Sequence, residues 1–295
     1  MELLAKGGTS EVFSYGNDRI LKLYYGNNMS DAADREFMNS KIIYNFGFPT
    51  PAPITRIEID GRSGIIFQQL TGPTLMETLF KNQEDTIHTL AEMMAAFHKI
   101  PVGNYLHHYL TDDISWYINN AVLIDDNERI WLKGLATSIP CGNTFIHGDF
   151  NPFNILMHHD VPMLIDFVSL SIGNALFDVA YTVMMFRYAE PPDKDLTILK
   201  RLIPMRSILE QLFIDEYMRI LPFDLAALEP WLIMAAIERL NPYNNFDLSA
   251  KRVYAAFIHD KFQWPDNETS EKMCYKAGFR KIFEIEESYA MYTEV

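Results

Sequence analysis

Apolar residues occur in short runs over the first seventy positions, and tight turns separate these runs, a pattern that predicts strands. Residues 3–25 contain several β-prone runs. Residues 54–59 and 64–70 form a further pair around an Asp-Gly sequence, which is a strong hairpin signal. Between them, residues 30–45 carry an imperfect helical stripe. We therefore predict a small antiparallel sheet accompanied by one helix.

The pattern changes at Gly72-Pro73, after which apolar residues recur at helical spacing. We predict helices at residues 75–80, 86–98, 112–123, 128–136, 179–188, 196–220, 225–240 and 248–262. His98 ends one of these helices close to Pro101, and we expect it to cap that helix. A boundary between a sheet region and a helical region thus falls near residue 72.

Polar groups follow two strand-like runs within the helical region. Asp149 comes shortly after residues 144–146, Asn154 lies five positions later, and Asp166 directly follows residues 163–165. Phosphoryl transfer needs a carboxylate to orient the acceptor hydroxyl, and oxygen ligands for magnesium. Asp149 can supply the first, and Asn154 with Asp166 the second. Each residue alone is more often a turn or helix cap, but the ordered set favours a site.

The sequence H-G-D-x-x-x-x-N, followed by an apolar run ending in Ile-Asp, resembles the catalytic core of the aminoglycoside phosphotransferase family. Residues 173–178 resemble the G-D-P-x-x-D segment of this family but depart from it at Asn174 and Ala175. The resemblance extends over about residues 6–245. It implies an α+β, two-lobed protein-kinase-like fold, with a small antiparallel-sheet N-terminal lobe and a larger, mostly helical C-terminal lobe.

The resemblance also implies a division of the chain. Residues 1–72 would form a nucleotide-binding lobe that ends in a hinge, and residues 73–265 a helical lobe with the catalytic loop and acceptor pocket. Residues 266–295 form a tail whose role the sequence does not define. The tail is similar to the closing segment of GNAT-type acetyltransferases, but so short a segment cannot build an acetyl-CoA site alone. Acetyl transfer is therefore not assigned.

A glycine-rich turn lies near the N-terminus, at Gly7 and Gly8, with Ser10 after it. Glycines let backbone N–H groups approach phosphate oxygens, although the turn matches neither a Walker A motif nor G-x-G-x-x-G. The resemblance implies that these residues contact a nucleotide, ATP or GTP. It also implies that backbone groups of Gln68 and Leu70, in the hinge, pair with the base.

Lys22 alternates with two leucines in a predicted strand and therefore faces away from them. By resemblance its ammonium bridges the α- and β-phosphates. Glu36 and Asp34 both lie on the following helix and could hold it; spacing does not choose between them, whereas the family pattern favours Glu36. By the same resemblance Asp178 supports the backbone of the loop that begins at His147.

The resemblance implies a reaction in which the γ-phosphoryl group of ATP or GTP passes to a hydroxyl group. Asp149 would orient and deprotonate that hydroxyl, while Asn154 and Asp166 hold Mg²⁺. Asp178 lies only twelve positions after Asp166, which leaves too few residues for a peptide-positioning segment, and Gly148 replaces the arginine of protein kinases. These departures favour a small acceptor over a protein.

The composition limits the classes of partner that we expect the protein to bind. The chain has 295 residues, 25 Lys and Arg against 39 Asp and Glu, and a net charge of −14, which argues against nucleic acid. The acidity suits a cationic acceptor and equally suits plain solubility. Two distant cysteines indicate neither disulfides nor zinc. Because no apolar stretch reaches the length of a membrane span or signal peptide, we expect a cytoplasmic protein without membrane contact. The oligomeric state is not indicated.

Several functions stay open on the sequence alone. The acceptor could be an aminoglycoside, choline, a hydroxy amino acid, or a sugar or glycated amine. The chain could also be an inactive kinase-fold binding module, or a protein kinase that acts on a partner. Glu238 and Arg239 are candidate contacts to the acceptor because the resemblance places the acceptor pocket among the C-terminal helices.

Overall fold

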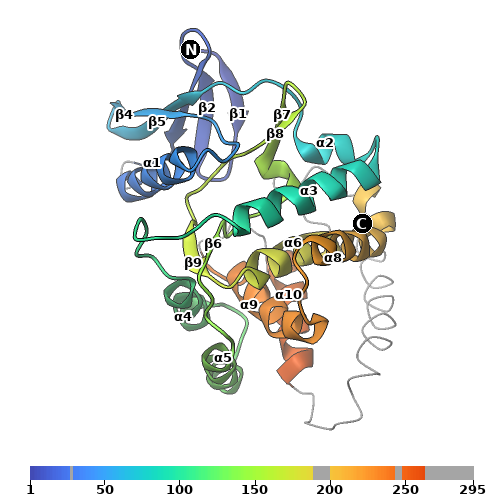
Figure 1. Cartoon of the computed structure of the whole chain (residues 1–295). Helices are drawn as coiled ribbons and strands as arrows, with labels where there is room; N and C mark the ends of the chain where they lie inside the picture. Colours follow the sequence, from blue (N-terminus) through green and yellow to red (C-terminus); the bar gives the residue numbers. More distant parts are fainter. Residues whose placement is uncertain (27–28, 189–199, 243–247, 263–295) are drawn as a thin grey trace, which may run out of the picture. The chain divides into compact units, whose positions relative to one another are not determined.

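The computed structural model describes residues 1–26, 29–188, 200–242 and 248–262. The described residues up to Ile258 form one compact unit. The sheet region and the helical region both belong to this unit, which is the one described below (Figure 1). The boundaries proposed at residues 72 and 265 stay predictions, and the acetyltransferase-like tail lies outside the described residues.

A five-stranded antiparallel sheet occupies the N-terminal region. Its strands are β1 (Leu3–Lys6), β2 (Ser10–Ser14), β3 (Arg19–Tyr24), β4 (Pro53–Ile59) and β5 (Arg62–Gln68), in the order β1-β2-β3-β5-β4. In β3, Leu21 and Leu23 are buried on one face. Tyr24 packs on the other face, toward helix α1 (Ser30–Asn45). The alternation therefore turns Lys22 toward α1.

The apolar stripe of helix α1 is imperfect because some of its buried positions are polar. Its buried residues recur at helical spacing, but Glu36 and Asn39 are polar. Asn39 donates a hydrogen bond of 2.8 Å from Nδ2 to the carbonyl oxygen of Phe167, beside Asp166. Polar residues in the buried stripe thus connect the sheet region to the segment that carries the chemistry.

Helices make up most of the remaining described chain (Figure 1). They are α2 (Leu75–Leu79), α3 (Gln83–His98), α4 (Leu110–Asn120), α5 (Asp126–Ser138), α6 (Leu176–Tyr188), α8 (Arg206–Ile220), α9 (Glu229–Arg239) and α10 (Leu248–Phe262). Helix α6 is buried from Phe177 to Phe186, and it packs against α8 and α9. This all-round burial explains why α6 is apolar on every face.

Two small two-stranded sheets carry the candidate catalytic segments. Strand β6 (Thr144–Ile146) pairs with β9 (Ser171–Gly173), and β7 (Ile155–His158) pairs with β8 (Val161–Leu164). The loop with Asp149 runs from β6 to β7 through a 3₁₀ turn, η1 (Pro152–Asn154). Asp166 lies between β8 and β9. These two strand pairings bring the β6–β7 loop, which carries Asp149, close to the β8–β9 segment, which carries Asp166.

Two predicted helices contain a 3₁₀ turn close to a proline, and residues 196–199 of one of them lie outside the described residues. The helix predicted at 196–220 is described from Lys200 and passes through a 3₁₀ turn, η2 (Ile203–Met205), before α8 begins at Arg206. The helix predicted at 225–240 starts as η3 (Leu225–Leu228), and α9 follows with Pro230 in its first turn. Proline lacks the N–H that a helix interior needs, so both helices restart beside it.

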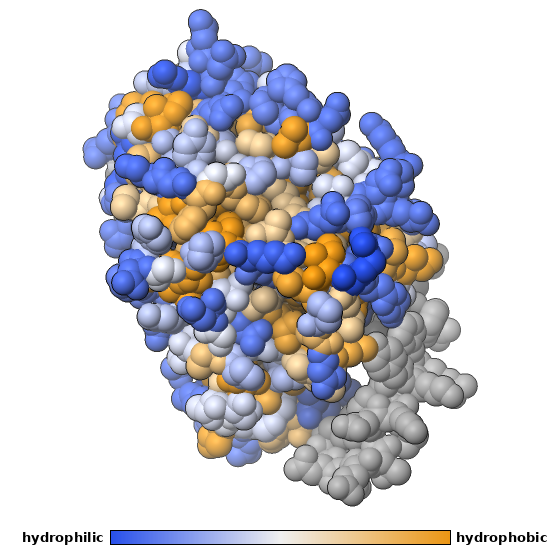
Figure 2. All heavy atoms as spheres, viewed as in Figure 1, coloured by the Kyte–Doolittle hydropathy of each residue, from blue (hydrophilic) through white to orange (hydrophobic). Residues whose placement is uncertain are grey.

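No single helix among the described residues is long and apolar enough to cross a membrane. Residues 200–220 and 225–239 pass that test only together, as a pair bent by 116°. Most of α9 is buried, so its apolar residues serve the core. On the face shown in Figure 2, hydrophilic residues predominate and apolar residues gather in separate patches.

Candidate active site

Lys22 stands at the centre of a cluster of charged groups. Its Nζ lies 2.8 Å from Glu36 Oε1 and 3.1 Å from Asp166 Oδ1. Lys22 is 12% exposed and Glu36 2%, so water screens their attraction little. The hydroxyl of Tyr24 donates to Glu36 Oε2. The cluster joins β3, α1 and the segment after β8.

The structure places Glu36, and not Asp34, against Lys22. Asp34 is half exposed and forms an ion pair with Arg56 on β4. The two acidic residues are two positions apart on α1, so they project in directions about 200° apart. Only one of them can therefore face β3.

The charged groups in this cluster shift one another's pKa. Burial alone would lower the pKa of Lys22, but the carboxylates of Asp166 and Glu36 outweigh it and raise that pKa. Burial opposes ionisation of Asp166, yet the Lys22 ammonium holds its pKa below the ordinary value. For Glu36, burial prevails over Lys22 and raises the pKa. Lys22 and Asp166 are therefore a stable ion pair at neutral pH.

Asp149 is held by two amide side chains. Its Oδ1 accepts a hydrogen bond of 2.7 Å from Asn151 Nδ2, and its Oδ2 accepts one of 2.8 Å from Asn154 Nδ2. Asn151 is buried and its own oxygen accepts from the N–H of Phe153. Both carboxylate oxygens of Asp149 are thus fixed in orientation by a loop that is itself closed by hydrogen bonds.

The start of this loop is anchored by Asp178 from α6. Asp178 Oδ2 accepts from the N–H of His147 at 2.8 Å, and Oδ1 accepts from the N–H of Gly148 at 2.9 Å. His147 is buried, and its Nε2 lies 3.0 Å from the carbonyl oxygen of Ile165. Asp178 thus binds the loop backbone, and His147 connects the loop to the residue before Asp166.

Gly148 is required by this geometry. Its φ is +80°, which favours glycine, and a Cβ would come within 2.8 Å of the Ser169 side chain. The arginine found at this position in protein kinases would therefore not fit here.

Asn154 and Asp166 suit a magnesium ion that arrives with a nucleotide. Asn154 uses its Nδ2 on Asp149, which leaves Oδ1 as its donor atom for a metal. Asp166 Oδ1 is shielded from solvent and lies 3.1 Å from Lys22 Nζ. Among the residues that the structure describes, no group of three His, Cys, Asp or Glu side chains is arranged to hold a metal ion. Mg²⁺ usually takes one or two carboxylates plus phosphate oxygens, so this donor set fits it.

The remaining candidates lie along the sheet. Gly7 and Gly8 form the β1–β2 turn, where the N–H of Gly7 donates to the carbonyl oxygen of Ser10 at 2.9 Å. Gln68 ends β5, and its N–H is taken by the carbonyl oxygen of Ala52 at 2.9 Å. The N–H of Gln68 is thus already bonded within the sheet region, and the pairing of Gln68 and Leu70 backbone groups with a base stays a prediction.

Residues 71–73 contact the β7–β8 hairpin. Met157 N–H donates to the carbonyl oxygen of Pro73 at 2.9 Å, and Thr71 N–H donates to His158 Nδ1 at 3.0 Å. Gly72 has a φ of +131°, and a Cβ there would lie 2.1 Å from the carbonyl oxygen of Met157. Only glycine permits this close approach.

The model of the phosphotransferase enzyme family matches residues 2–211, more than two thirds of the 295 residues. The chain belongs to this family. It is accordingly an enzyme of the phosphotransferase class, and the family resemblance drawn from the sequence is confirmed. No curated protein matches the chain.

Solved structures of aminoglycoside phosphotransferases share the fold of this phosphotransferase. A thermostable mutant of APH(4)-Ia is 18% identical, with a TM-score of 0.61 over 88% of this chain and 91% of that chain. APH(3'')-Id from Streptomyces rimosus is 14% identical, with a TM-score of 0.57 over 80% and 92% of the two chains. A complex of APH(2")-IIia with GDP and kanamycin is 14% identical, with a TM-score of 0.57 over 89% and 91%. The predicted kinase-like α+β fold is therefore confirmed.

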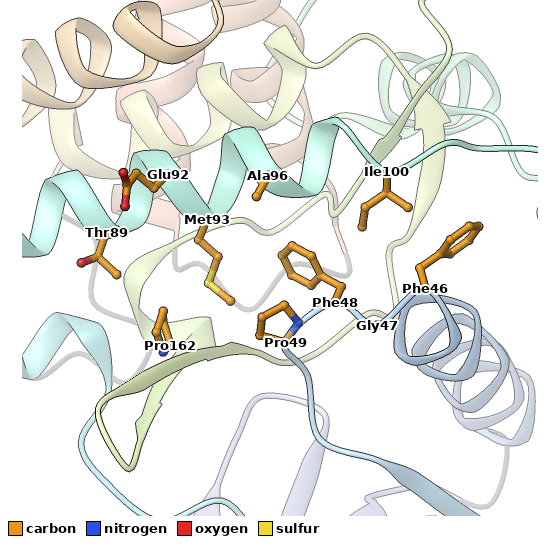
Figure 3. Close-up of a pocket in the computed structure, with 10 residues that line it drawn as sticks. All are labelled: Phe46, Gly47, Phe48, Pro49, Thr89, Glu92, Met93, Ala96, Ile100 and Pro162. Atoms are coloured by element: carbon orange, nitrogen blue, oxygen red, sulfur yellow. The ribbon is translucent and has the colours of Figure 1, made fainter.

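Two cavities in the described part of this phosphotransferase lie away from the candidate residues. One of about 360 Å³ opens between α3 and residues 46–49. In Figure 3, Met93 from α3 and Phe48 point into it from facing sides. A second cavity of about 400 Å³ lies between α4, α5 and Trp231. Neither contains Lys22, Asp149 or Asp166, so the site is defined by polar contacts and not by these hollows.

The structure adds residues that the sequence did not indicate. Asn151 fixes Asp149, as described above. Tyr181 on α6 is buried, burial raises the pKa of its hydroxyl, the charge of Asp149 adds to that shift, and the hydroxyl accepts a hydrogen bond from Arg239. Arg239 is 5% exposed and stacks on the Tyr181 ring at 3.9 Å from its centroid. Its neighbour Glu238 is only partly buried. Arg239 therefore contacts Tyr181, and any effect of Arg239 on Asp149 would pass through that side chain. Glu238 retains access to solvent.

The expected cap at His98 is wrong. Its side chain is buried and turns inward to Asp178 and to Tyr217 on α8, at 3.2 and 2.7 Å. Both partners lie far away in sequence, so the local sequence around His98 carried no sign of them.

Proposed function

We propose that this phosphotransferase transfers the γ-phosphoryl group of ATP or GTP to a hydroxyl group of a small cationic molecule such as an aminoglycoside. One observation carries the proposal. Contacts connect four residues in the order Lys22, Asp166, Asn154 and Asp149. Lys22 contacts Asp166 at 3.1 Å. The N–H of Ile165, the residue before Asp166, donates to the Asn154 carbonyl oxygen at 2.9 Å, and the Asn154 side chain contacts Asp149 at 2.8 Å. A phosphate-binding cation, two metal ligands and a base are thereby held in order.

On the nucleotide side, the ammonium of Lys22 would bind phosphate oxygens, and Glu36 would hold it in place. The backbone of Gly7 and Gly8, with Ser10, would contact the phosphates. The hinge carbonyl of Gln68 and the N–H of Leu70 would pair with the base. Relatives of this fold support nucleotide binding, because one APH(4)-Ia structure contains AMP-PNP and the APH(2")-IIia structure contains GDP.

Asn154 and Asp166 would hold Mg²⁺. When bound, the ion neutralises charge on the transferring phosphoryl group. Asp166 needs a lowered pKa for this role, and Lys22 provides it. Lys22 and Asp166 would therefore exchange part of their mutual attraction for contacts with the nucleotide.

On the acceptor side, Asp149 would accept the hydroxyl proton, and Asn151 and Asn154 would aim its carboxylate. Glu238 is an acidic residue of the same helical region, but it forms an ion pair with Arg239 at 3.3 Å, so its charge is partly neutralised. The preference for a cationic acceptor therefore rests on the net charge of −14. Structures that share the fold contain hygromycin B and kanamycin.

The proposal is tested by incubating the protein with Mg²⁺ and γ-labelled ATP or GTP against a panel of aminoglycosides, choline, hydroxy amino acids and sugars. We expect transfer to a cationic member of the panel, and loss of transfer in Asp149→Asn. Asp160→Asn, the same change at an exposed turn residue, is the matched control. Nucleotide binding without transfer to any acceptor would favour a binding module and overturn the proposal.

A further inference from the structure

A buried tyrosine and a buried arginine form a closely packed pair in the helical region. Tyr181 lies on α6 and Arg239 is the last residue of α9, and these two helices pack against each other (Figure 1). The two residues are 4% and 5% exposed. Nη1 of Arg239 donates a hydrogen bond to the Tyr181 hydroxyl, and the guanidinium lies 3.9 Å from the centroid of the ring. Each side chain therefore restrains the other.

Helix α6 turns Tyr181 toward the loop that carries the proposed base. Asp178 binds backbone N–H groups at the start of that loop. The Thr182 hydroxyl donates to the carbonyl oxygen of Phe150, the residue after Asp149. Position 182 lies about 40° around the helix from position 178, and position 181 about 60° from it on the other side. Tyr181 thus projects from the side of α6 that faces the loop.

Hydrogen-bonding capacity limits where the Tyr181 proton can go. A guanidinium only donates, so the Tyr181 oxygen accepts from Arg239 and its own O–H needs another acceptor. A buried hydroxyl without an acceptor is costly. Burial raises the pKa of Tyr181, Arg239 opposes this shift, and the charge of Asp149 adds to it more than that of Glu238. Glu238 is already held by Arg239 at 3.3 Å. Asp149 is therefore the favoured acceptor.

We propose that Arg239 holds the Tyr181 phenol so that its O–H donates to the Asp149 carboxylate. Tyr181 and Arg239 are thus positioning residues, and this inference rests on the proposed role of Asp149 as the base. Asn151 and Asn154 each donate to one oxygen of that carboxylate. An ionised carboxylate can accept about four hydrogen bonds, so a phenol and the acceptor hydroxyl can both be added. The phenol connects the base to a packed helix.

Direct contact with the acceptor would make a different demand on Arg239. A residue that only binds the acceptor changes the acceptor KM, and its effect is independent of the Tyr181 hydroxyl. In the proposed series, Arg239 acts through Tyr181, so its loss has no further effect once that hydroxyl is absent. A double-variant cycle therefore separates the two roles.

The first measurement uses no substrate. In protein labelled with ¹³C-aspartate, the Asp149 ¹³Cγ resonance is assigned by its loss in Asp149→Asn. Tyr181→Phe keeps the ring and removes only the hydroxyl, so it should shift this resonance. Arg239→Met should shift it in the same direction, whereas Arg239→Lys retains a cationic donor and should stay close to the parent. Tyr254→Phe removes the hydroxyl of another buried tyrosine, on α10, and should leave the resonance unchanged.

Kinetics with the acceptor identified by the panel test the consequence. Tyr181→Phe should lower kcat about tenfold with little change in the nucleotide KM, because it removes a charge-assisted hydrogen bond from the reacting group. Arg239→Met should lower kcat by a similar factor, and the double variant should be no slower than the slower single one. Arg187→Met is the matched control: Arg187 is mostly buried and pairs with Glu210 on α8 at 3.1 Å, and its loss should leave kcat parent-like.

The inference is overturned by a parent-like Asp149 resonance in Tyr181→Phe; a shift of the Glu238 ¹³Cδ resonance instead would assign the proton to Glu238. Losses in kcat that multiply in the double variant, or an Arg239→Met effect confined to the acceptor KM, overturn it as well. If Arg239→Met does not fold, Arg239→Lys takes its place in the cycle, and any loss in kcat that persists undiminished in the Tyr181→Phe background overturns the role of Arg239.

The resonance also keeps this inference separate from the proposed function. A parent protein that phosphorylates no acceptor would refute the proposed function. The Asp149 resonance, measured without substrate, would still decide whether Tyr181 bonds to that carboxylate.

Discussion

The buried pair of Lys22 and Glu36 leads to a measurable coupling in stability. Replacing Glu36 by Leu leaves the ammonium of Lys22 with Asp166 alone and removes the acceptor of the Tyr24 hydroxyl. Breaking a buried ion pair from one side costs about 3–5 kcal/mol. Because Asp166 still compensates Lys22, we expect Glu36→Leu to cost about 3 kcal/mol, at the low end of that range.

The double variant should behave differently from either single one. Lys22→Met leaves a carboxylate that is 2% exposed beside Tyr24, and should also cost about 3 kcal/mol. In Lys22→Met/Glu36→Leu both charges are absent and apolar side chains of similar size remain. The pair together should then cost less than about 3 kcal/mol, against about 6 kcal/mol for the sum of the two single variants, which gives a coupling free energy of at least about 3 kcal/mol.

Urea denaturation followed by far-UV circular dichroism would measure these values. Tryptophan fluorescence would not suffice, because all four tryptophans lie at residue 116 or later, outside the sheet region. Lys6→Met is the matched control: Lys6 is 62% exposed and 3.5 Å from Glu11, and its loss should cost less than about 1 kcal/mol. Single costs that simply add, or that each fall below about 1 kcal/mol, would refute the reasoning.

Four further outcomes are expected. Asp149→Asn should lower kcat by about 10²–10⁴-fold while nucleotide affinity measured by calorimetry stays within a few-fold, and a parent-like kcat would exclude Asp149 as the base. Asp166→Ala should abolish the Mg²⁺-dependent part of ATP affinity in the same calorimeter; an undiminished Mg²⁺ effect would contradict its assignment. If the acceptor is cationic, kcat/KM should fall as salt rises and N-acetylated acceptors should react more slowly, whereas equal rates at two salt concentrations would speak against charge selection. A hydrogen bond to Asp113 raises the pKa of His108. The resulting stabilisation should be complete below about pH 6.5, should fade as pH rises through the raised folded-state pKa, and should disappear in Asp113→Asn; unchanged pH-dependence of urea midpoints in that variant would show that the pair does not titrate as described.

Local pattern was sufficient for most of the secondary structure. The hairpin around Asp60-Gly61 became β4 and β5, and the periodic stretch at 248–262 became α10 with the same limits. The 3₁₀ turns near Pro204 and Pro230 were not predicted, because periodicity continues through a 3₁₀ turn that a proline makes necessary. The order of Asp149, Asn154 and Asp166 could likewise be read from the sequence, since Asp149 and Asp166 each come after an apolar run and Asn154 lies five positions after Asp149.

The sequence by itself determined which polar groups the chain offers and on which elements they lie, because strand alternation and helical period are local properties. Only the tertiary structure decided which of these groups meet. It chose Glu36 over Asp34 through the face of α1 that packs on the sheet. It also brought His98 to Asp178, 80 residues away, and to Tyr217, 119 residues away. Such contacts depend on how α3, α6 and α8 pack, and helix packing is fixed by the whole core and not by the residues that it brings together.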